Sequence, residues 1–194
     1  MRWRLLRGGD VPPNPNPSPN NDGLNRFVEP YRWPADKERI TLAFGAVWED
    51  VYTPINPHKG LDVSPWPGAT GAAAYAPMSG EVATAVHGHP TLGNYVLLSR
   101  QSASSFFASD LKGNLRKIPR GGRYEMLLAH LDTIRIKTGA KINAGDSIGT
   151  IGATGLAFGA HIHWELRYNG IRLDPMGFAL AADPALAKRV IYAG

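Results

Sequence analysis

The stretch from Gly155 to Arg167 constrains this chain more than any other part of its sequence. It places His161 and His163 two residues apart in a β-like run, HIHWELR. Successive side chains of a strand point to opposite faces, so both imidazoles leave the same face of one strand. A glycine-rich turn precedes the run and lets backbone or ligand approach the imidazoles closely. The stretch therefore predicts a strand that carries part of a site.

The rest of the chain consists of short apolar runs separated by turn residues. With 22 Gly and 16 Pro in 194 residues, the composition favours strands and turns over long helices. We expect a mostly β protein in which 94–99 (NYVLLS) pairs with 124–130 (YEMLLAH). Other strands are predicted at 39–44, 61–64, 75–78, 80–86, within 141–151, and after Ala160. A short C-terminal piece, 175–180 and 184–190, is predicted to be helical.

The sequence divides into an arm and one globular domain. Residues 10–23 (DVPPNPNPSPNNDG) lack apolar surface to bury and favour extended backbone, so we assign residues 1–30 to a Pro/Asn-rich arm or linker. The arm is either an inert tail or a docking segment. Residues 31–194 form the domain, with a core at about 39–178. Residues 100–123 interrupt it as a hairpin insertion much longer than usual.

Charge narrows the choice of partners. The formal net charge is +5, and residues 100–123 carry six basic residues against one acidic residue, which accounts for that whole excess. A basic insertion suits an anionic wall polymer or closes over a groove; the alternative is a mobile, solvated loop. No recognition element for nucleic acid accompanies the charge, so we do not expect that partner. No run of 18 or more apolar residues predicts a membrane span.

The chain has no cysteine, so a metal site would have to use histidine and carboxylate side chains. His58 and Asp62 form a His-x-x-x-Asp pair in a loop interrupted by proline and glycine, and His163 could complete a set of three. Two imidazoles and one carboxylate leave a fourth position open for water on zinc. The spacing alone is weak, and histidines buried without metal are the alternative.

The segments around these residues favour the zinc site over histidines buried without metal. FGAVWEDVYTPINPHKGLDVSP, GNYVLLS, LLAHL, AGDSIGTIGATG and GAHIHWELR occur here in one order. In this they resemble the lysostaphin-type zinc peptidoglycan endopeptidases over about residues 39–178. The resemblance implies a compact antiparallel β-sandwich of the duplicated hybrid motif type, with the site in a groove across one sheet. The long insertion at 100–123 departs from the family pattern.

The resemblance also implies roles for five residues. His58 and Asp62 of HKGLD and His163 of HIH match the zinc ligands, whereas His130 of LLAHL and His161 match the two catalytic histidines. Peptide hydrolysis needs a proton-transfer group and a group that stabilises the oxyanion, and two imidazoles suit these tasks. Which of them is the base stays open at this point.

Other residues near these motifs have less certain roles. Tyr52, Gly155 and Gly159 are candidate substrate contacts, and Trp48 either lines the groove or serves packing. Glu165 either orients His163 or faces solvent. We expect His87 and His89, another His-x-His pair, to lie in a surface turn because of Gly88 and Pro90; a secondary zinc or substrate contact is the alternative.

The expected function is a zinc metalloendopeptidase that cleaves cross-links or stem peptides of bacterial peptidoglycan. The rival is a cell-wall-binding or hydrolase-activating module of the same fold without catalysis. Such a protein acts at the cell wall, in the extracellular space, in the periplasm or as part of a phage virion, which the arm could contact. The first ten residues do not read as a signal peptide, so the numbered chain either reaches the wall by another route or follows a removed leader. Glycyl bridges, D-alanyl-diaminopimelate cross-links and stem peptides all remain open as substrates.

Overall fold

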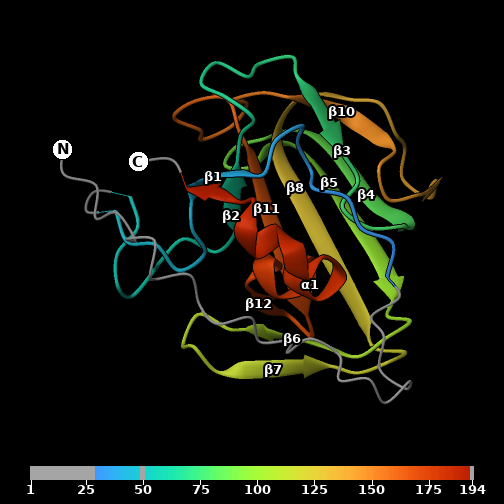
Figure 1. Cartoon of the computed structure of the whole chain (residues 1–194). Coiled ribbons are helices and arrows are strands. Elements are labelled where there is room, and N and C mark those ends of the chain that lie inside the picture. The colour runs from blue at the N-terminus through green and yellow to red at the C-terminus, as the bar shows by residue number, and fades with distance from the viewer. Residues whose placement is uncertain (1–28, 49–50, 193–194) are drawn as a thin grey trace.

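The computed structural model describes residues 29–48 and 51–192, and it is built mainly from antiparallel strands (Figure 1). Most of the predicted arm, residues 1–28, lies outside the described part of the chain. No helix among the described residues is long and apolar enough to cross a membrane. The predicted fold class, a mostly β sandwich with a short C-terminal helical piece, is confirmed.

The strands follow the predicted apolar runs, with ends that differ by a few residues. They are β1 (Arg39–Leu42), β2 (Leu61–Val63), β3 (Ala73–Tyr75), β4 (Gly80–His89), β5 (Gly93–Gln101), β6 (Phe106–Ser109), β7 (Leu115–Ile118), β8 (Arg123–Ile134), β9 (Lys141–Ile142), β10 (Ser147–Ile151), β11 (Ile162–Tyr168), β12 (Ile171–Leu173) and β13 (Ile191–Tyr192).

The long strand β8 lies at the centre of the main sheet, whose order is β13-β1-β2-β11-β8-β5-β4-β9. The predicted pairing of 94–99 with 124–130 is confirmed, because Val96 is opposite Leu128 where β5 runs antiparallel to β8. On its other side β8 pairs with β11, and its far end pairs with β10. Residues that are distant in the sequence thus meet on the two strands beside β8.

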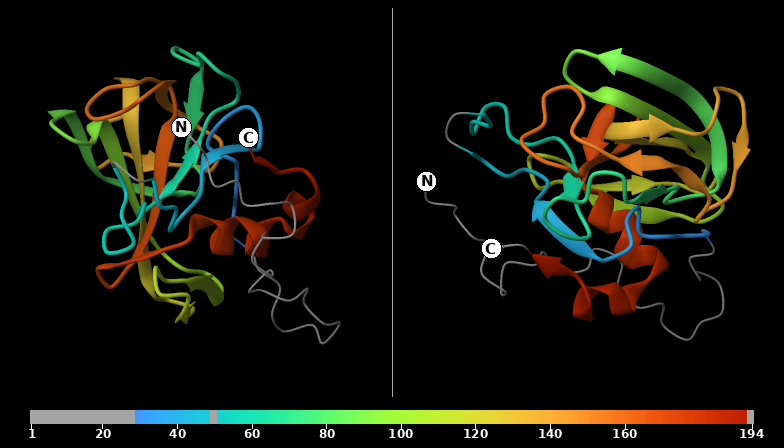
Figure 2. Two further views of the ribbon diagram at one scale, coloured as in Figure 1. Left: turned by 90° about the vertical axis from the view of Figure 1, so that its left-hand side faces the viewer. Right: turned by 90° about the horizontal axis from the view of Figure 1, so that it is seen from above.

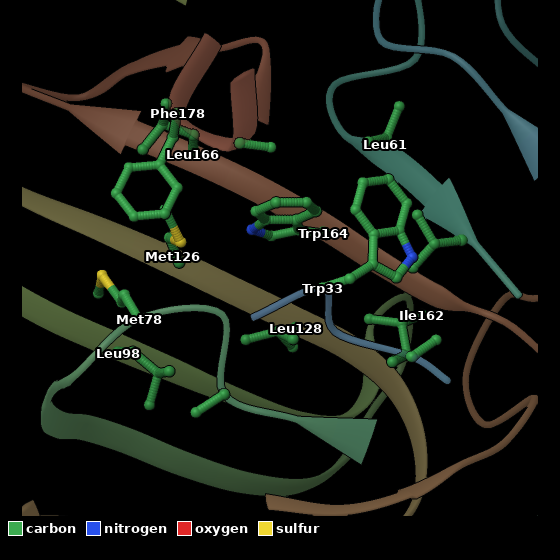
Figure 3. Packing of buried hydrophobic residues seen from close by; sticks show 14 of the residues in the cluster. Trp33, Leu61, Met78, Leu98, Met126, Leu128, Ile162, Trp164, Leu166 and Phe178 are labelled. Carbon is green, nitrogen blue, oxygen red and sulfur yellow. The ribbon is translucent and has the colours of Figure 1, made fainter. Parts of the chain in front are cut away.

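The hydrophobic core covers one face of this sheet, as Figure 3 shows for Trp164, Leu128 and Met126. Trp33 packs edge-on against Trp164, with ring centroids 5.8 Å apart. Because strand side chains alternate, a core-facing Trp164 requires its neighbours His163 and Glu165 to face the other way. Core packing therefore determines which side of β11 is available for a site.

The C-terminal piece is helical, as predicted. Helix α1 (Pro175–Ala182) begins after Asp174, whose carboxylate accepts a hydrogen bond from the Met176 backbone N–H and caps the helix. A 3-10 helix follows at Pro184–Lys188. A Cβ atom on Gly177 would lie 2.6 Å from the Cβ of Ala108, so glycine lets α1 approach β6 closely.

The basic insertion is folded rather than a free loop. Strands β6 and β7 form a hairpin of their own, and the Phe106 ring packs 5.5 Å from that of Phe178 in α1. Asp110 accepts hydrogen bonds from the Arg116 side chain and from the Asn114 backbone at the hairpin turn. Figure 1 shows the hairpin at the end of β8 where that strand begins, whereas His130 lies near its other end. No residue of 100–123 lines the groove described below, but Asp110 of the hairpin pairs with Leu173 beside the groove residue Arg172, so closure over the groove stays a prediction.

The insertion is also attached to the segment before the first strand. Glu29 is buried, and its Oε1 accepts hydrogen bonds from Ser102 Oγ at 3.0 Å and from the Ala103 backbone N–H at 2.5 Å. Its Oε2 lies 3.1 Å from Nη1 of Arg100. A buried carboxylate with these partners connects the last residues of the predicted arm to the start of the insertion.

We expect Glu29→Ala to lower the free energy of unfolding by about 3 kcal/mol, since it leaves a largely buried guanidinium and backbone N–H groups without their acceptor. Urea denaturation measures the loss. Glu81→Ala is the control, because Glu81 pairs with Lys141 at an exposed site and its removal should change stability little. Equal stability losses for the two variants would contradict this account.

Candidate functional site

Asp62 and His163 are placed opposite each other by the pairing of β2 with β11. Directly opposed residues of an antiparallel pair project from the same face of the sheet. His58 comes from the loop before β2 and is fully buried beside them. The three residues that the sequence predicted as a set therefore converge, although 101 residues separate Asp62 from His163 in the chain.

The potential ligand atoms of these residues form a small triangle. Nδ1 of His163 lies 2.9 Å from Nε2 of His58 and 2.9 Å from Oδ1 of Asp62, and the third side, from His58 Nε2 to Asp62 Oδ1, is 3.1 Å. Ligands of tetrahedral zinc, at about 2.0–2.1 Å from the metal, lie about 3.3 Å from one another. The triangle thus has nearly the dimensions that three ligands of one zinc ion require.

Hydrogen bonds on the far sides of both rings determine which nitrogens face the triangle. His58 donates its Nδ1–H to the carbonyl oxygen of Ala43 at 2.9 Å, and His163 donates its Nε2–H to Oε1 of Glu165 at 3.2 Å. The other nitrogen of each neutral ring then carries a lone pair. Two lone pairs and a carboxylate oxygen at this separation repel one another unless a cation or a shared proton lies between them. The residues fit a divalent metal.

The pKa values of Asp62 and His163 in the metal-free site also indicate that a positive charge between these residues is favourable. Burial raises the pKa of Asp62, but hydrogen bonds with His163 and His58 outweigh it and hold that pKa well below its usual range. Burial lowers the pKa of His163, but the neighbouring carboxylates Asp62 and Glu165 outweigh it and raise that pKa to about 9. Without metal, the site takes up a proton instead.

Glu165 contacts His163 rather than facing solvent freely. It is 3% exposed, and its second oxygen accepts hydrogen bonds from Nε of Arg167 at 2.6 Å and from Nε of Arg172 at 3.0 Å. A carboxylate that accepts the far N–H of a ligand histidine fixes the orientation of that ring. The sequence left two roles open for Glu165, orienting His163 or facing solvent. This contact supports the orienting role.

Gly60 explains the glycine of the HKGLD motif. A Cβ atom there would lie 2.6 Å from Cε1 and 2.7 Å from Nε2 of His163, and 2.8 Å from the carbonyl oxygen of Trp164. Any larger residue must displace the His163 ring or the β11 backbone beside it. The glycine is therefore needed for close approach and not for an unusual backbone angle.

We expect Gly60→Ala to weaken zinc binding by about 10- to 100-fold, the usual range when the orientation of a ligand is disturbed. Competition with a chromophoric chelator measures the affinity, and circular dichroism checks that the chain is folded. Gly159→Ala is the matched control, because a Cβ atom there meets no heavy atom within 4 Å. Unchanged zinc affinity in Gly60→Ala would show that the His163 ring tolerates displacement.

The remaining two predicted histidines lie beside the triangle. The His130 ring is 4.8 Å from the His161 ring and 5.9 Å from the His163 ring. Nε2 of His161 is 3.5 Å from Oδ2 of Asp62, and its Nδ1–H donates to the carbonyl oxygen of Gly159. His130 donates its Nδ1–H to the carbonyl oxygen of Thr154 at 2.8 Å. Burial lowers the pKa of His130 to about 4, with a further contribution from His161, so its ring is neutral near pH 7.

His130 reaches the site through an irregularity in β8. Ala129 is opposite His163, so strict alternation would turn the next side chain, that of His130, toward the core. Instead His130 has φ +62°, and the register of β8 with β5 shifts between Asn94 and Val96. This left-handed conformation is uncommon for a residue with a side chain, and here it brings the imidazole of a candidate catalytic residue to the other face.

We expect His130→Gly to unfold at a higher temperature than His130→Ala, with a difference in unfolding free energy of about 1 kcal/mol, because glycine adopts positive φ without a steric penalty. Thermal denaturation of the two variants measures this. His87, an exposed residue of β4, is the control: there the glycine variant should be the less stable of the pair. The same order at both positions would argue against strain at His130.

Three of the five site residues, His58, His130 and His163, line a groove of about 480 Å³. Its lining residues are Val51, Tyr52, Asn56, Pro57, His58, Lys59, His89, Thr91, Leu92, His130, Leu156, Phe158, His163, Glu165, Arg167 and Arg172.

Among the candidate substrate contacts, Tyr52 lines the groove and its ring lies 4.9 Å from that of His58. Between the two candidate glycines, Leu156 and Phe158 line the groove and are largely exposed. Gly155 itself packs against the turn at 91–93, where a Cβ atom would lie 2.3 Å from the Gly93 nitrogen. Substrate contact by Gly155 and Gly159 stays a prediction.

Trp48 packs against the ring of Phe158 at 5.0 Å, which favours the packing role for this tryptophan.

His89 is the clearest departure from the sequence prediction. The strand β4 continues through His87 to His89, so the pair is not confined to a surface turn. His89 lines the groove, and its Nδ1 accepts hydrogen bonds from the backbone N–H groups of Thr91 and Leu92. Gly88 and Pro90 suggested that the strand ends before His89, and only the β4–β5 hairpin shows where the His89 ring lies.

Arg172 also lines the groove and was not predicted from the sequence, because β12 is too short to give a periodic signal.

Comparisons with known proteins agree with this geometry. Residues 104–175 match the family model described as Peptidase family M23. The chain is 30% identical over 172 residues to the peptidoglycan DD-endopeptidase ShyA of Vibrio cholerae, an alignment that covers 88% of this chain and 34% of ShyA. It is 26% identical over 162 residues to the murein hydrolase activator NlpD of Salmonella dublin, covering 84% of this chain and 34% of NlpD. The chain thus spans about a third of the length of these curated relatives.

Solved structures of peptidases are also similar to this chain. A zinc containing peptidase from Vibrio cholerae is 27% identical, with a TM-score of 0.55 over 77% of this chain and 40% of that one. The catalytic domain of lysostaphin from Staphylococcus simulans, 21% identical, shares the fold with a TM-score of 0.52 over 76% of this chain and 91% of that domain. Residues 104–175 carry the match to peptidase family M23, and the predicted resemblance to the lysostaphin-type peptidases is confirmed by this match and by the shared fold.

Proposed function

We propose that this protein is a zinc metalloendopeptidase that hydrolyses peptide bonds in bacterial peptidoglycan. The observation that carries the proposal is the convergence of His58 Nε2, Asp62 Oδ1 and His163 Nδ1, at separations of 2.9 to 3.1 Å, beside two further imidazoles. The similarity to ShyA, which is named as a peptidoglycan endopeptidase, supports the choice of substrate.

In this proposal His58, Asp62 and His163 hold the zinc and leave a coordination position open. When bound, zinc supplies Lewis acidity and lowers the pKa of water to about 7, which makes a nucleophile available near neutral pH. Glu165 keeps the His163 ring in the orientation and tautomer that binding needs, because it accepts the ring's far N–H.

The rings of His130 and His161 then divide proton transfer and oxyanion stabilisation between them. Each donates its Nδ1–H to a backbone carbonyl, so the Nε2 atom is the one that can exchange a proton. A neutral ring accepts a proton from the attacking water and passes it to the leaving amine, whereas a protonated ring donates to the developing oxyanion.

The setting of this activity is proposed as well. Residues 31–194 would form the peptidase domain and act at the cell wall, either outside the cell, in the periplasm or on a phage virion. Contact of the arm with a larger assembly stays a prediction that falls mainly on residues outside the described part. Binding of anionic wall polymer by the insertion also stays a prediction; Lys112, Lys117 and Arg120 are exposed there.

We expect the purified protein to contain close to one equivalent of zinc and to clear a suspension of bacterial sacculi. His163→Ala should lose both properties, since it removes a ligand atom. His130→Ala and His161→Ala should retain zinc but hydrolyse at least about 100-fold more slowly, the range for loss of an acid–base group. Metal analysis and turbidity give the two readouts, and His87→Ala is the control with an exposed histidine outside the groove.

The similarity to NlpD suggests a rival function, a module that activates another hydrolase. The same measurements test it. A protein that binds no metal, leaves sacculi intact and stimulates a separate murein hydrolase would favour that rival. Full activity in His163→Ala would overturn the ligand assignment. The complete ligand set favours the enzyme.

A further inference from the structure

The groove around the candidate metal centre has an unbalanced charge. Its described lining residues include three cationic side chains, Lys59, Arg167 and Arg172, and one carboxylate, that of Glu165. A divalent cation beside Asp62 would make the groove more positive still. Such a surface selects for a ligand that carries negative charge.

The two arginines are placed by strand pairing. Arg167 of β11 is directly opposite Arg172 of β12, so both side chains project from the face that also carries His163 and Glu165. Each donates its Nε–H to the same oxygen of Glu165, at 2.6 and 3.0 Å. The side chains remain 23% and 37% exposed, and among the described residues their terminal nitrogens have no hydrogen-bond partner.

Glu165 cannot neutralise this pair. A single carboxylate faces two guanidinium groups, and its other oxygen already accepts the His163 N–H. Glu125 is opposite Arg167 on β8, but in the described part of the chain it makes no ion pair with that residue within 4.0 Å. A net positive charge with free planar N–H edges therefore remains in the groove, and this arrangement suits a carboxylate.

We propose that Arg167 and Arg172 bind a free carboxylate of the substrate. The site deepens the proposed function and rests on it. The Glu165 carboxylate bridges the His163 ring and the guanidinium groups. Because an extended peptide advances about 3.3 Å per residue, the bound carboxylate belongs to a residue about two or three positions from the cleaved bond. The preferred substrates are then acidic peptides such as diaminopimelate cross-links, and not glycyl bridges, which carry no side-chain carboxylate.

The test compares D-alanyl-diaminopimelate cross-linked peptides that differ only in their carboxyl groups. One has free carboxyl groups, one is amidated at the diaminopimelate carboxyl, and one is amidated at the C-terminus. We expect the zinc-loaded full chain to cleave the free form with at least about tenfold higher kcat/KM than one of the amides, consistent with loss of a charge-assisted contact. The amide that is disfavoured identifies which carboxylate is bound.

Arg172→Gln is the variant that addresses the site directly, because a glutamine amide can still donate a hydrogen bond to Glu165 but carries no charge. We expect it to reduce the tenfold preference to about one, mainly through a higher KM for the free form. Arg135→Gln, an exposed arginine outside the groove, should keep the preference. Retention of the full preference in Arg172→Gln would overturn the assignment.

Calorimetry measures the binding of the same peptides to the metal-free full chain. It distinguishes the proposed carboxylate site from the proposed hydrolase function. If no peptide is hydrolysed but the free form binds about tenfold more tightly than an amide, the hydrolase proposal fails and the carboxylate site stands. If all the peptides are cleaved and bound equally, the carboxylate site fails and the hydrolase proposal stands.

Discussion

The pairing of β2 with β11 is the constraint on which the rest of this site depends. It places Asp62 directly opposite His163, and that register holds two potential metal ligands on one face while Trp164, between His163 and Glu165, is buried in the core. A shift of one residue would move every side chain of the strand to the opposite face. Burial of Trp164 therefore fixes the site as well as the core, because the two sets of side chains alternate along one strand.

The remaining parts of the site are added to this pair by close backbone approaches. Gly60 lets the chain pass directly beside the His163 ring, and Gly155 lets the 153–160 loop pack against the turn at 91–93. The carbonyl of Thr154 in that loop accepts the N–H of His130. The glycines thus do not contact the metal ligands as functional groups; they remove the Cβ atoms that would keep the functional groups apart.

The same face of β11 continues from the candidate metal centre to the proposed carboxylate site. His163, Glu165 and Arg167 follow one another at intervals of two, and each contacts the next. Glu165 is therefore shared between an imidazole and two guanidinium groups. Because of this sharing, the two proposed properties, metal affinity and substrate preference, would be physically coupled: the carboxylate that orients the His163 ring also holds the arginines in the groove.

Much of this was visible in the sequence, because strands with one buried face leave an apolar pattern and because the HKGLD, LLAHL and HIHWELR motifs keep chemistry-bearing residues at fixed spacings. The sequence alone determined the mostly β fold, the pairing of 94–99 with 124–130 and the five histidine and carboxylate candidates. Only the tertiary structure decided how His130 crosses to the site face, that His89 and Arg172 line the groove, and that the basic insertion packs against α1. Those features depend on a bulge, a hairpin turn and contacts between distant strands, and non-local contacts of this kind leave no periodic signal in the chain.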